Sequence, residues 1–149
     1  LFQKVREERG LAYSVYSAVN AFKDAGVMMV YAGTSPDKGD ELLSVVRDEL
    51  CDLRENGPQA REVEVAKEHL KGSLMLSLES TSSRMSNLAR QEMYHGRTIS
   101  MEDTLRRLDR VTRAEVHRMA QNVFSRRTPA LAAVGRTRTL KAVRRGFTL

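Results

Sequence analysis

The sequence of 149 residues has no tryptophan, only one cysteine and only three prolines. A single thiol cannot form an internal disulfide, so the chain is not a disulfide-stapled scaffold. No apolar run approaches the roughly 20 residues that a bilayer-spanning helix needs, and no membrane partner is expected. With 41% apolar and 30% charged residues, the composition excludes a disordered chain and predicts one globular domain or a piece of a larger one.

The one cysteine, Cys51, lies between Leu50 and Leu53 in a helical pattern of apolar residues. A small residue at the boundary of a core is expected at such a position. A catalytic thiol would need a neighbouring base, and nothing in the sequence places one beside it. Cys51 is therefore interpreted as a structural residue.

Acidic residues are absent after Glu115. Eight of the 25 lysines and arginines follow that position, which leaves 17 basic against 19 acidic residues in residues 1–115, a net charge of about −2. The basic tail over 136–149 raises the alternative of a nucleic-acid-binding module. Only Phe124 and Phe147 interrupt the basic segment, so it lacks the aromatic stacking platforms of single-strand binders, and no nucleic acid partner is expected.

The first nine residues are typical of the last turns of a helix, with Leu1, Phe2 and Val5 on one side and charges on the other. Gly10 then supplies a left-handed stop. Two runs of β-branched, aromatic and small residues follow, and the turn between them predicts a β-hairpin over 12–34. The second run, GVMMVYAGT, is apolar almost throughout, so both of its faces are expected to be covered.

Helical periodicity dominates the next part of the chain, and helices are predicted over 36–124. Ser100 and Thr112 each precede a carboxylate by three residues, as in capping boxes. The apolar run PALAAV predicts one more strand over 129–134, ahead of the basic tail. This order predicts an α+β fold with a mostly antiparallel sheet and helices packed on it. Three strands with an apolar middle member leave that sheet incomplete.

The three histidines, His69, His95 and His117, do not form a recognisable metal motif. The nearest match to H-x-x-E-H ends at His69, and Val65 stands where the first histidine belongs. One imidazole on an apolar helical stripe is not a zinc site. His95 is assigned to the end of a helix, and His117 is expected to be exposed. Nucleophile elbows and phosphate-binding loops are also missing, so these residues hold no complete catalytic machinery.

The stretch LFQKVREERGLAYSVYSAV closely resembles the C-terminal-domain motif of the pitrilysin/insulinase family of zinc metallopeptidases, in its mitochondrial processing peptidase-like bacterial branch. The later segments EVAKEHLKGSLMLSLESTSSRMSNLARQEMYHGR, VTRAEVHRMAQNVF and PALAAVG are similar to the same family in order and spacing. The resemblance implies that residues 1–149 are the later part of the C-terminal peptidase-family domain. This would be an incomplete domain of the metallohydrolase fold.

In that family the second domain supplies an arginine and a tyrosine in the pattern R-x-x-x-x-x-x-Y. The pattern maps onto Arg6 and Tyr13, with Gly10 between them. The resemblance implies that the Tyr13 phenol donates a hydrogen bond to the scissile carbonyl or its oxyanion, and that Arg6 binds substrate backbone or helps hold this geometry. Without the motif, Arg6 would be one surface arginine among many and Tyr13 a half-buried strand residue.

The resemblance further implies a zinc-dependent endopeptidase that acts on extended peptides, bound by strand addition to an open sheet edge. Zinc would be bound outside this chain, in a zinc-bearing N-terminal domain or partner subunit, and the chain alone is expected to be inactive. A catalytically silent subunit or scaffold of the same family is the alternative. A homodimer through the open edge is a further option, and a cytoplasmic location is favoured.

Overall fold

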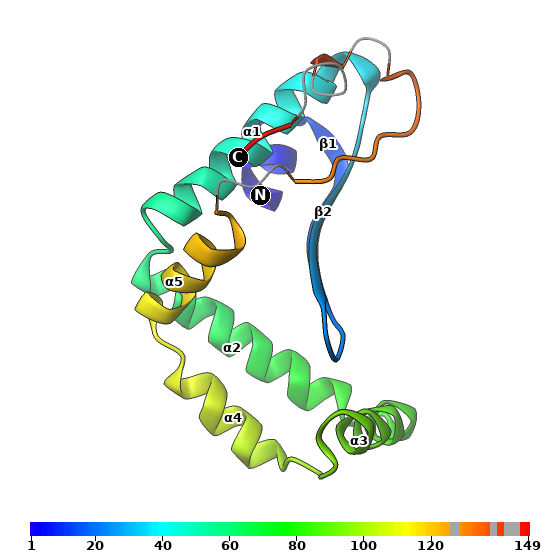
Figure 1. Cartoon of the computed structure of the whole chain (residues 1–149), viewed down its shortest axis with the longest axis vertical. Helices are drawn as coiled ribbons and strands as arrows, with labels where there is room; N and C mark the ends of the chain where they lie inside the picture. Colours follow the sequence, from blue (N-terminus) through cyan, green and yellow to red (C-terminus); the bar gives the residue numbers. More distant parts are fainter. Residues whose placement is uncertain (126–128, 138–139, 142–146) are drawn as a thin grey trace. The chain divides into compact units, whose positions relative to one another are not determined.

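The computed structural model describes residues 1–125, 129–137, 140–141 and 147–149. It divides into two compact units. The hairpin unit comprises Leu1–Asn56 with Met119–Leu149, and the helical unit comprises Gly57–Arg118. Figure 1 shows strands β1 and β2 and helix α1, which belong to the hairpin unit, and helices α2, α3 and α4, which belong to the helical unit.

The hairpin unit begins with a short π-helix, η1, over Gln3–Glu8. Strand β1 over Ala12–Ala21 and strand β2 over Gly26–Thr34 follow. The two strands pair antiparallel, with Tyr16 opposite Tyr31 and their rings stacked at a centroid distance of 5.1 Å. The predicted hairpin is therefore confirmed, and so is the helix that ends ahead of it.

The core of this unit forms where helix α1, over Gly39–Glu55, packs against η1 and one face of the hairpin. A single 3-10 turn, Pro36–Lys38, leads into α1. Val5 of η1 is fully buried, and the side chains clustered with it are all apolar: Leu11, Ala12, Val15, Leu42, Val45 and Val46. Removing these side chains from water stabilises the junction between η1 and β1, because residues from both of its sides belong to the cluster.

The expectation that both faces of β2 are covered is wrong for this structure. Met28, Met29 and Tyr31 are 40%, 40% and 50% exposed. The buried cluster reaches only as far along β2 as Val30 and Ala32, and the described residues place no third strand beside the hairpin. A predominantly apolar strand with an open edge agrees with the prediction of an incomplete sheet.

Residues 129–134 do not form the predicted strand. They are described without regular secondary structure, and the side chains of Leu131 and Val134 are exposed. A strand needs the backbone N–H and C=O groups of a neighbour, and among the described residues β1 and β2 pair only with each other. The apolar run is therefore present without a partner that would make it a strand.

The basic tail over 136–149 is described in part, because 138–139 and 142–146 lie outside the described residues. Leu140 lies against Gly39, where a larger side chain would overlap it. The backbone N–H of Lys141 donates to the carboxylate of Asp40 at 2.8 Å. Leu140 and Lys141 of the tail therefore contact the first turn of α1.

The helical unit contains α2 over Ala60–Ser77, α3 over Thr81–His95 and α4 over Met101–Arg110. Helix α5, over Arg113–Val123, begins in this unit and ends in the other. All these helices lie within the predicted helical region. Helix α3 is followed by Gly96, whose φ of +62° is the left-handed conformation that glycine adopts at no steric cost and that ends the helix.

Two helix starts carry the capping interactions expected from the sequence. At α4 the Ser100 hydroxyl accepts a hydrogen bond from the N–H of Asp103 at 3.0 Å. At α5 the Glu115 carboxylate accepts from the N–H of Thr112 at 2.9 Å, while the Thr112 hydroxyl accepts from the N–H of Glu115 at 3.3 Å. The second pair is a reciprocal capping box. The hydrogen bonds from the backbone and then the hydroxyl of Thr112 lower the pKa of Glu115.

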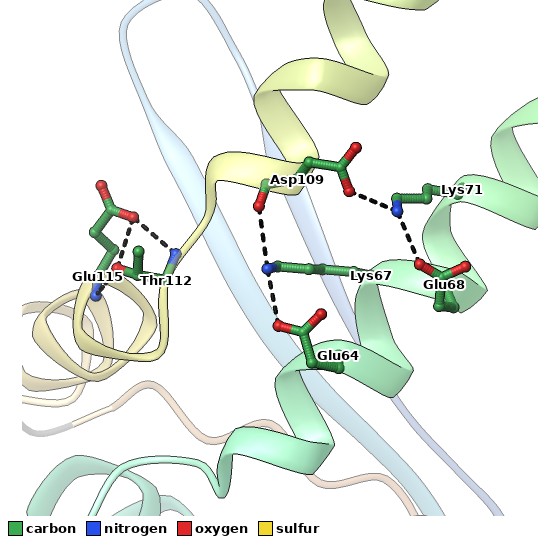
Figure 2. Close-up of polar contacts among 7 residues, drawn as sticks. All are labelled: Glu64, Lys67, Glu68, Lys71, Asp109, Thr112 and Glu115. Atoms are coloured by element: carbon green, nitrogen blue, oxygen red, sulfur yellow. Dashed lines mark hydrogen bonds and ion pairs between the residues drawn. The ribbon is translucent and has the colours of Figure 1, made fainter.

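Two lysines one turn apart on α2 connect this helix to the end of α4 (Figure 2). Lys67 is buried, and its ammonium donates to the backbone carbonyl of Asp109 at 3.2 Å and to the Glu64 carboxylate at 3.0 Å. Lys71 pairs with the Asp109 carboxylate at 2.5 Å and with Glu68 at 2.8 Å. Hydrogen bonds to Asp109 and then to Glu68 raise the pKa of Lys71. Both the backbone and the side chain of Asp109 are thereby held by α2.

Candidate functional site

The sequence-predicted pair, Arg6 and Tyr13, lies on the two sides of the turn from η1 into β1. Gly10 makes this turn with a φ of +57°, in the left-handed region that favours glycine. Its N–H donates to the Arg6 carbonyl at 3.2 Å, and the N–H of Leu11 donates to the Val5 carbonyl at 2.8 Å. The two residues that lead into β1 are therefore hydrogen-bonded directly to the backbone of the helix that carries Arg6.

Tyr13 is the extra residue of a β-bulge. The register pairs Ala12 with Thr34 and Ser14 with Gly33, so no residue of β2 lies opposite Tyr13. A bulge bends its strand and changes the direction of a side chain, and bulges are enriched next to active sites. The Tyr13 side chain is 86% exposed, which leaves its phenol accessible to a ligand. The half-buried strand position considered from the sequence is not what the structure shows.

The guanidinium of Arg6 lies close to two aromatic rings. Its Cζ is 5.3 Å from the ring centroid of Tyr13 and 5.1 Å from that of Phe2. Both distances are within the range of cation–π attraction. The structure therefore brings together the two residues singled out from the sequence, and adds a third that was not singled out. The signal for Phe2 was its position four residues before Arg6 in a helical pattern, where side chains lie on the same helix face.

The other cations of η1 contact carboxylates instead. Lys4 pairs with Glu49 of α1 at 2.5 Å, and this hydrogen bond raises the pKa of Lys4. The guanidinium of Arg9 lies 4.0 Å from the carboxylate of Glu41, which is also on α1. Within the described parts of the chain, the recorded ion pairs include none with Arg6. Its N–H groups are consequently available to donate to a ligand.

Side chains from the end of β2 and the turn after it also form hydrogen bonds to the backbone that joins η1 to β1. The Thr34 hydroxyl donates to the Leu11 carbonyl at 2.6 Å, and the Lys38 ammonium donates to the Gly10 carbonyl at 3.1 Å. The carbonyls of Gly10 and Leu11, both between Arg6 and Tyr13, are therefore hydrogen-bonded from outside the turn. A junction held in this way presents its exposed side chains on a rigid backbone.

The histidines belong to the helical unit, whereas Arg6 and Tyr13 belong to the hairpin unit. His69 is on α2 beside Val65, and His95 is the last residue of α3, as predicted. His117 was expected to be exposed but is half-buried, with its ring against Gly57. A glycine with a φ of +70° leaves room for the imidazole, which explains the difference. The described residues contain no group of three or more histidine, cysteine or acidic side chains that could hold a metal ion.

Cys51 is half-buried on α1, and its sulfur lies 3.7 Å from the guanidinium of Arg54. This position matches the predicted boundary of the core. In the described ranges, no helix combines the length and apolar character needed to cross a membrane.

Residues 1–70 match the family model described as the peptidase M16 inactive domain. An uncharacterized zinc protease of Bacillus subtilis is 44% identical over 97 residues, which are 65% of this chain and 24% of that protein. An uncharacterized zinc protease of Streptomyces coelicolor is 40% identical over 144 residues, which are 97% of this chain and 31% of that protein. The chain thus spans about a quarter to a third of the length of these relatives.

Solved structures show the same fold. A peptidase M16 inactive domain from Pseudomonas fluorescens superposes with a TM-score of 0.71 and 28% identity, over 80% of this chain and 28% of that one. The periplasmic protease PqqL from Escherichia coli gives a TM-score of 0.65 at 17% identity, over 80% of this chain and 14% of that one. The predicted α+β class and the incomplete domain are confirmed, and so is the resemblance read from the opening residues.

Proposed function

Residues 1–70 of this chain belong to the peptidase M16 inactive-domain family, and on that premise we propose that the chain is the substrate-contacting part of a zinc-dependent endopeptidase. Its substrates are extended peptides. Arg6 and Tyr13 are the two residues that act on them. Zinc is held outside this chain, by a zinc-bearing N-terminal domain or a partner subunit, and supplies the activated water.

The single observation that carries this proposal is the stack of Arg6 on the exposed ring of Tyr13. Tyr13 has a phenol O–H that can donate to a peptide carbonyl as negative charge develops on its oxygen. Arg6 has five N–H donors in one plane, which suit the carbonyl groups of an extended backbone. Because the two side chains flank one turn and contact each other, they can contact one peptide together.

The open edges of the hairpin support the choice of an extended peptide. Among the described residues β1 and β2 pair only with each other, so each strand keeps one row of backbone N–H and C=O groups for another strand. An extended peptide can add to such an edge through main-chain hydrogen bonds.

The test is Tyr13→Phe in the full-length protein that contains this chain. Loss of the phenol should lower kcat/KM for peptide hydrolysis by roughly 10- to 1000-fold, because one donor to the oxyanion is removed. Tyr16→Phe is the matched control, since Tyr16 lies on the same strand and its ring stacks on Tyr31 rather than on Arg6. It should retain the activity of the unchanged protein.

An unaltered kcat/KM for Tyr13→Phe would reject the role of the phenol. A full-length protein that holds zinc and cleaves no peptide would favour the catalytically silent alternative. The 149-residue chain alone should cleave nothing, with or without added zinc. Zinc-dependent cleavage by the purified chain would contradict the division of roles proposed for the two parts.

A further inference from the structure

We propose that Phe2 is a positioning residue that holds the Arg6 guanidinium in place against Tyr13. The inference rests on the proposed function, because it concerns how one of the two substrate-contacting side chains is oriented. It adds a residue that the R-x-x-x-x-x-x-Y pattern does not contain. The contact is carried by the 5.1 Å distance from the Arg6 Cζ to the Phe2 ring centroid.

The Phe2 side chain is not part of the buried core of the hairpin unit. The buried cluster of the hairpin unit is joined by its neighbour Leu1, whereas Phe2 leaves 47% of its surface exposed. The Phe2 ring does contact the guanidinium of Arg6.

The backbone explains why the two side chains meet. Phe2 has helical dihedral angles, φ −55° and ψ −52°, immediately ahead of η1. Residues four apart on a helix are neighbours on its surface. The second neighbour, Tyr13, belongs to β1, which follows the left-handed turn at Gly10. The guanidinium is therefore contacted by one ring from its own helix and by one ring from the strand.

Contact with two rings leaves the functional atoms of Arg6 free. Aromatic rings attract a guanidinium without accepting its N–H groups as a carboxylate would. A long side chain that would otherwise sample many rotamers is restricted before substrate arrives, which lowers the entropy lost on binding. A carboxylate partner would restrict Arg6 equally but would occupy the donors that the peptide needs.

The experiment uses the full-length protein and two substitutions at one position. Phe2→Leu removes the ring while keeping an apolar side chain, and Phe2→Tyr keeps the ring. Phe2→Leu should lower kcat/KM by about 3- to 30-fold, the range expected for one cation–π contact, mainly through KM. Phe2→Tyr should keep the kcat/KM of the unchanged protein, because it keeps the ring.

A double-mutant cycle distinguishes positioning from a general structural role. If Phe2 acts through Arg6, then Phe2→Leu should have no further effect in an Arg6→Ala background. Independent, additive losses would overturn the proposal, as would equal losses for Phe2→Leu and Phe2→Tyr.

A spectroscopic measurement separates this inference from the proposed function. With selectively labelled arginine, the side-chain protons of Arg6 should show upfield ring-current shifts that decrease in Phe2→Leu and are kept in Phe2→Tyr. An Arg6 signal that does not respond to Phe2→Leu overturns the contact itself. An unchanged kcat/KM for both Arg6→Ala and Tyr13→Phe would instead reject the proposed function. That test uses no Phe2 variant, so the two failures can be told apart.

Discussion

The guanidinium of Arg6 lies 5.3 Å from the ring centroid of Tyr13, although the two residues belong to different elements of secondary structure. Gly10, with a φ of +57°, turns the chain between them. The bulge in β1 then leaves Tyr13 without a residue opposite it. The geometry of the pair therefore depends on the backbone of the junction as much as on the two side chains.

Gly10→Ala should destabilise the protein by about 1–2 kcal/mol, the cost of placing an L-residue in the left-handed conformation. No atom lies within 4 Å of the position that its Cβ would take, so the cost is conformational rather than a clash. The free energy of unfolding from urea titration measures it.

Gly72→Ala is the matched control, because Gly72 lies inside α2 and is also open around its missing Cβ. This change should stabilise the helix by about 0.8–1 kcal/mol. Equal effects of the two substitutions would show that the left-handed turn at Gly10 does not govern stability.

Lys67→Met should destabilise the helical unit by about 1–3 kcal/mol. Methionine keeps the apolar stem of this buried side chain but removes the hydrogen bonds to the Asp109 carbonyl and to Glu64. Lys71→Met, one turn along α2, should have a smaller effect because its ion pairs are more exposed to water. Urea unfolding of both variants provides the comparison, and a larger loss for Lys71→Met would contradict it.

Acid should weaken the start of α5 through Glu115. Because the hydrogen bonds from Thr112 lower the pKa of Glu115 below its ordinary value of 4.5, the folded state favours the ionised carboxylate. Its contribution to stability is present above that value and is lost as the pH falls through the lowered pKa in the folded state.

Glu115→Gln tests this dependence, because glutamine can still accept from the N–H of Thr112 but does not titrate. The difference in urea midpoint between pH 7 and pH 3 should be smaller in Glu115→Gln than in the unchanged protein. An identical pH dependence in the two proteins would exclude Glu115 as a contributor.

The features predicted correctly are those with local signals. The hairpin, the run of helices and the caps at Ser100 and Thr112 follow from periodicity, turn residues and short-range hydrogen bonding. The strand expected over 129–134 does not form, because an apolar run becomes a strand only when a neighbouring strand pairs with it. The covering of β2 was predicted wrongly for a related reason, since burial of a strand depends on what packs against it.

The sequence by itself determined where Arg6, Gly10 and Tyr13 stand and that one glycine separates a helix from a strand, because residue spacing and a left-handed stop are encoded locally. Only the tertiary structure decided that Tyr13 lies on a bulge and that its ring meets the Arg6 guanidinium. These relationships require the register between β1 and β2 and the packing of η1 on α1. The packing of η1 on α1 joins residues far apart in the chain, such as Lys4 and Glu49, and the bulge arises where Ala12 pairs with Thr34 and Ser14 pairs with Gly33. No short-range pattern specifies either of them.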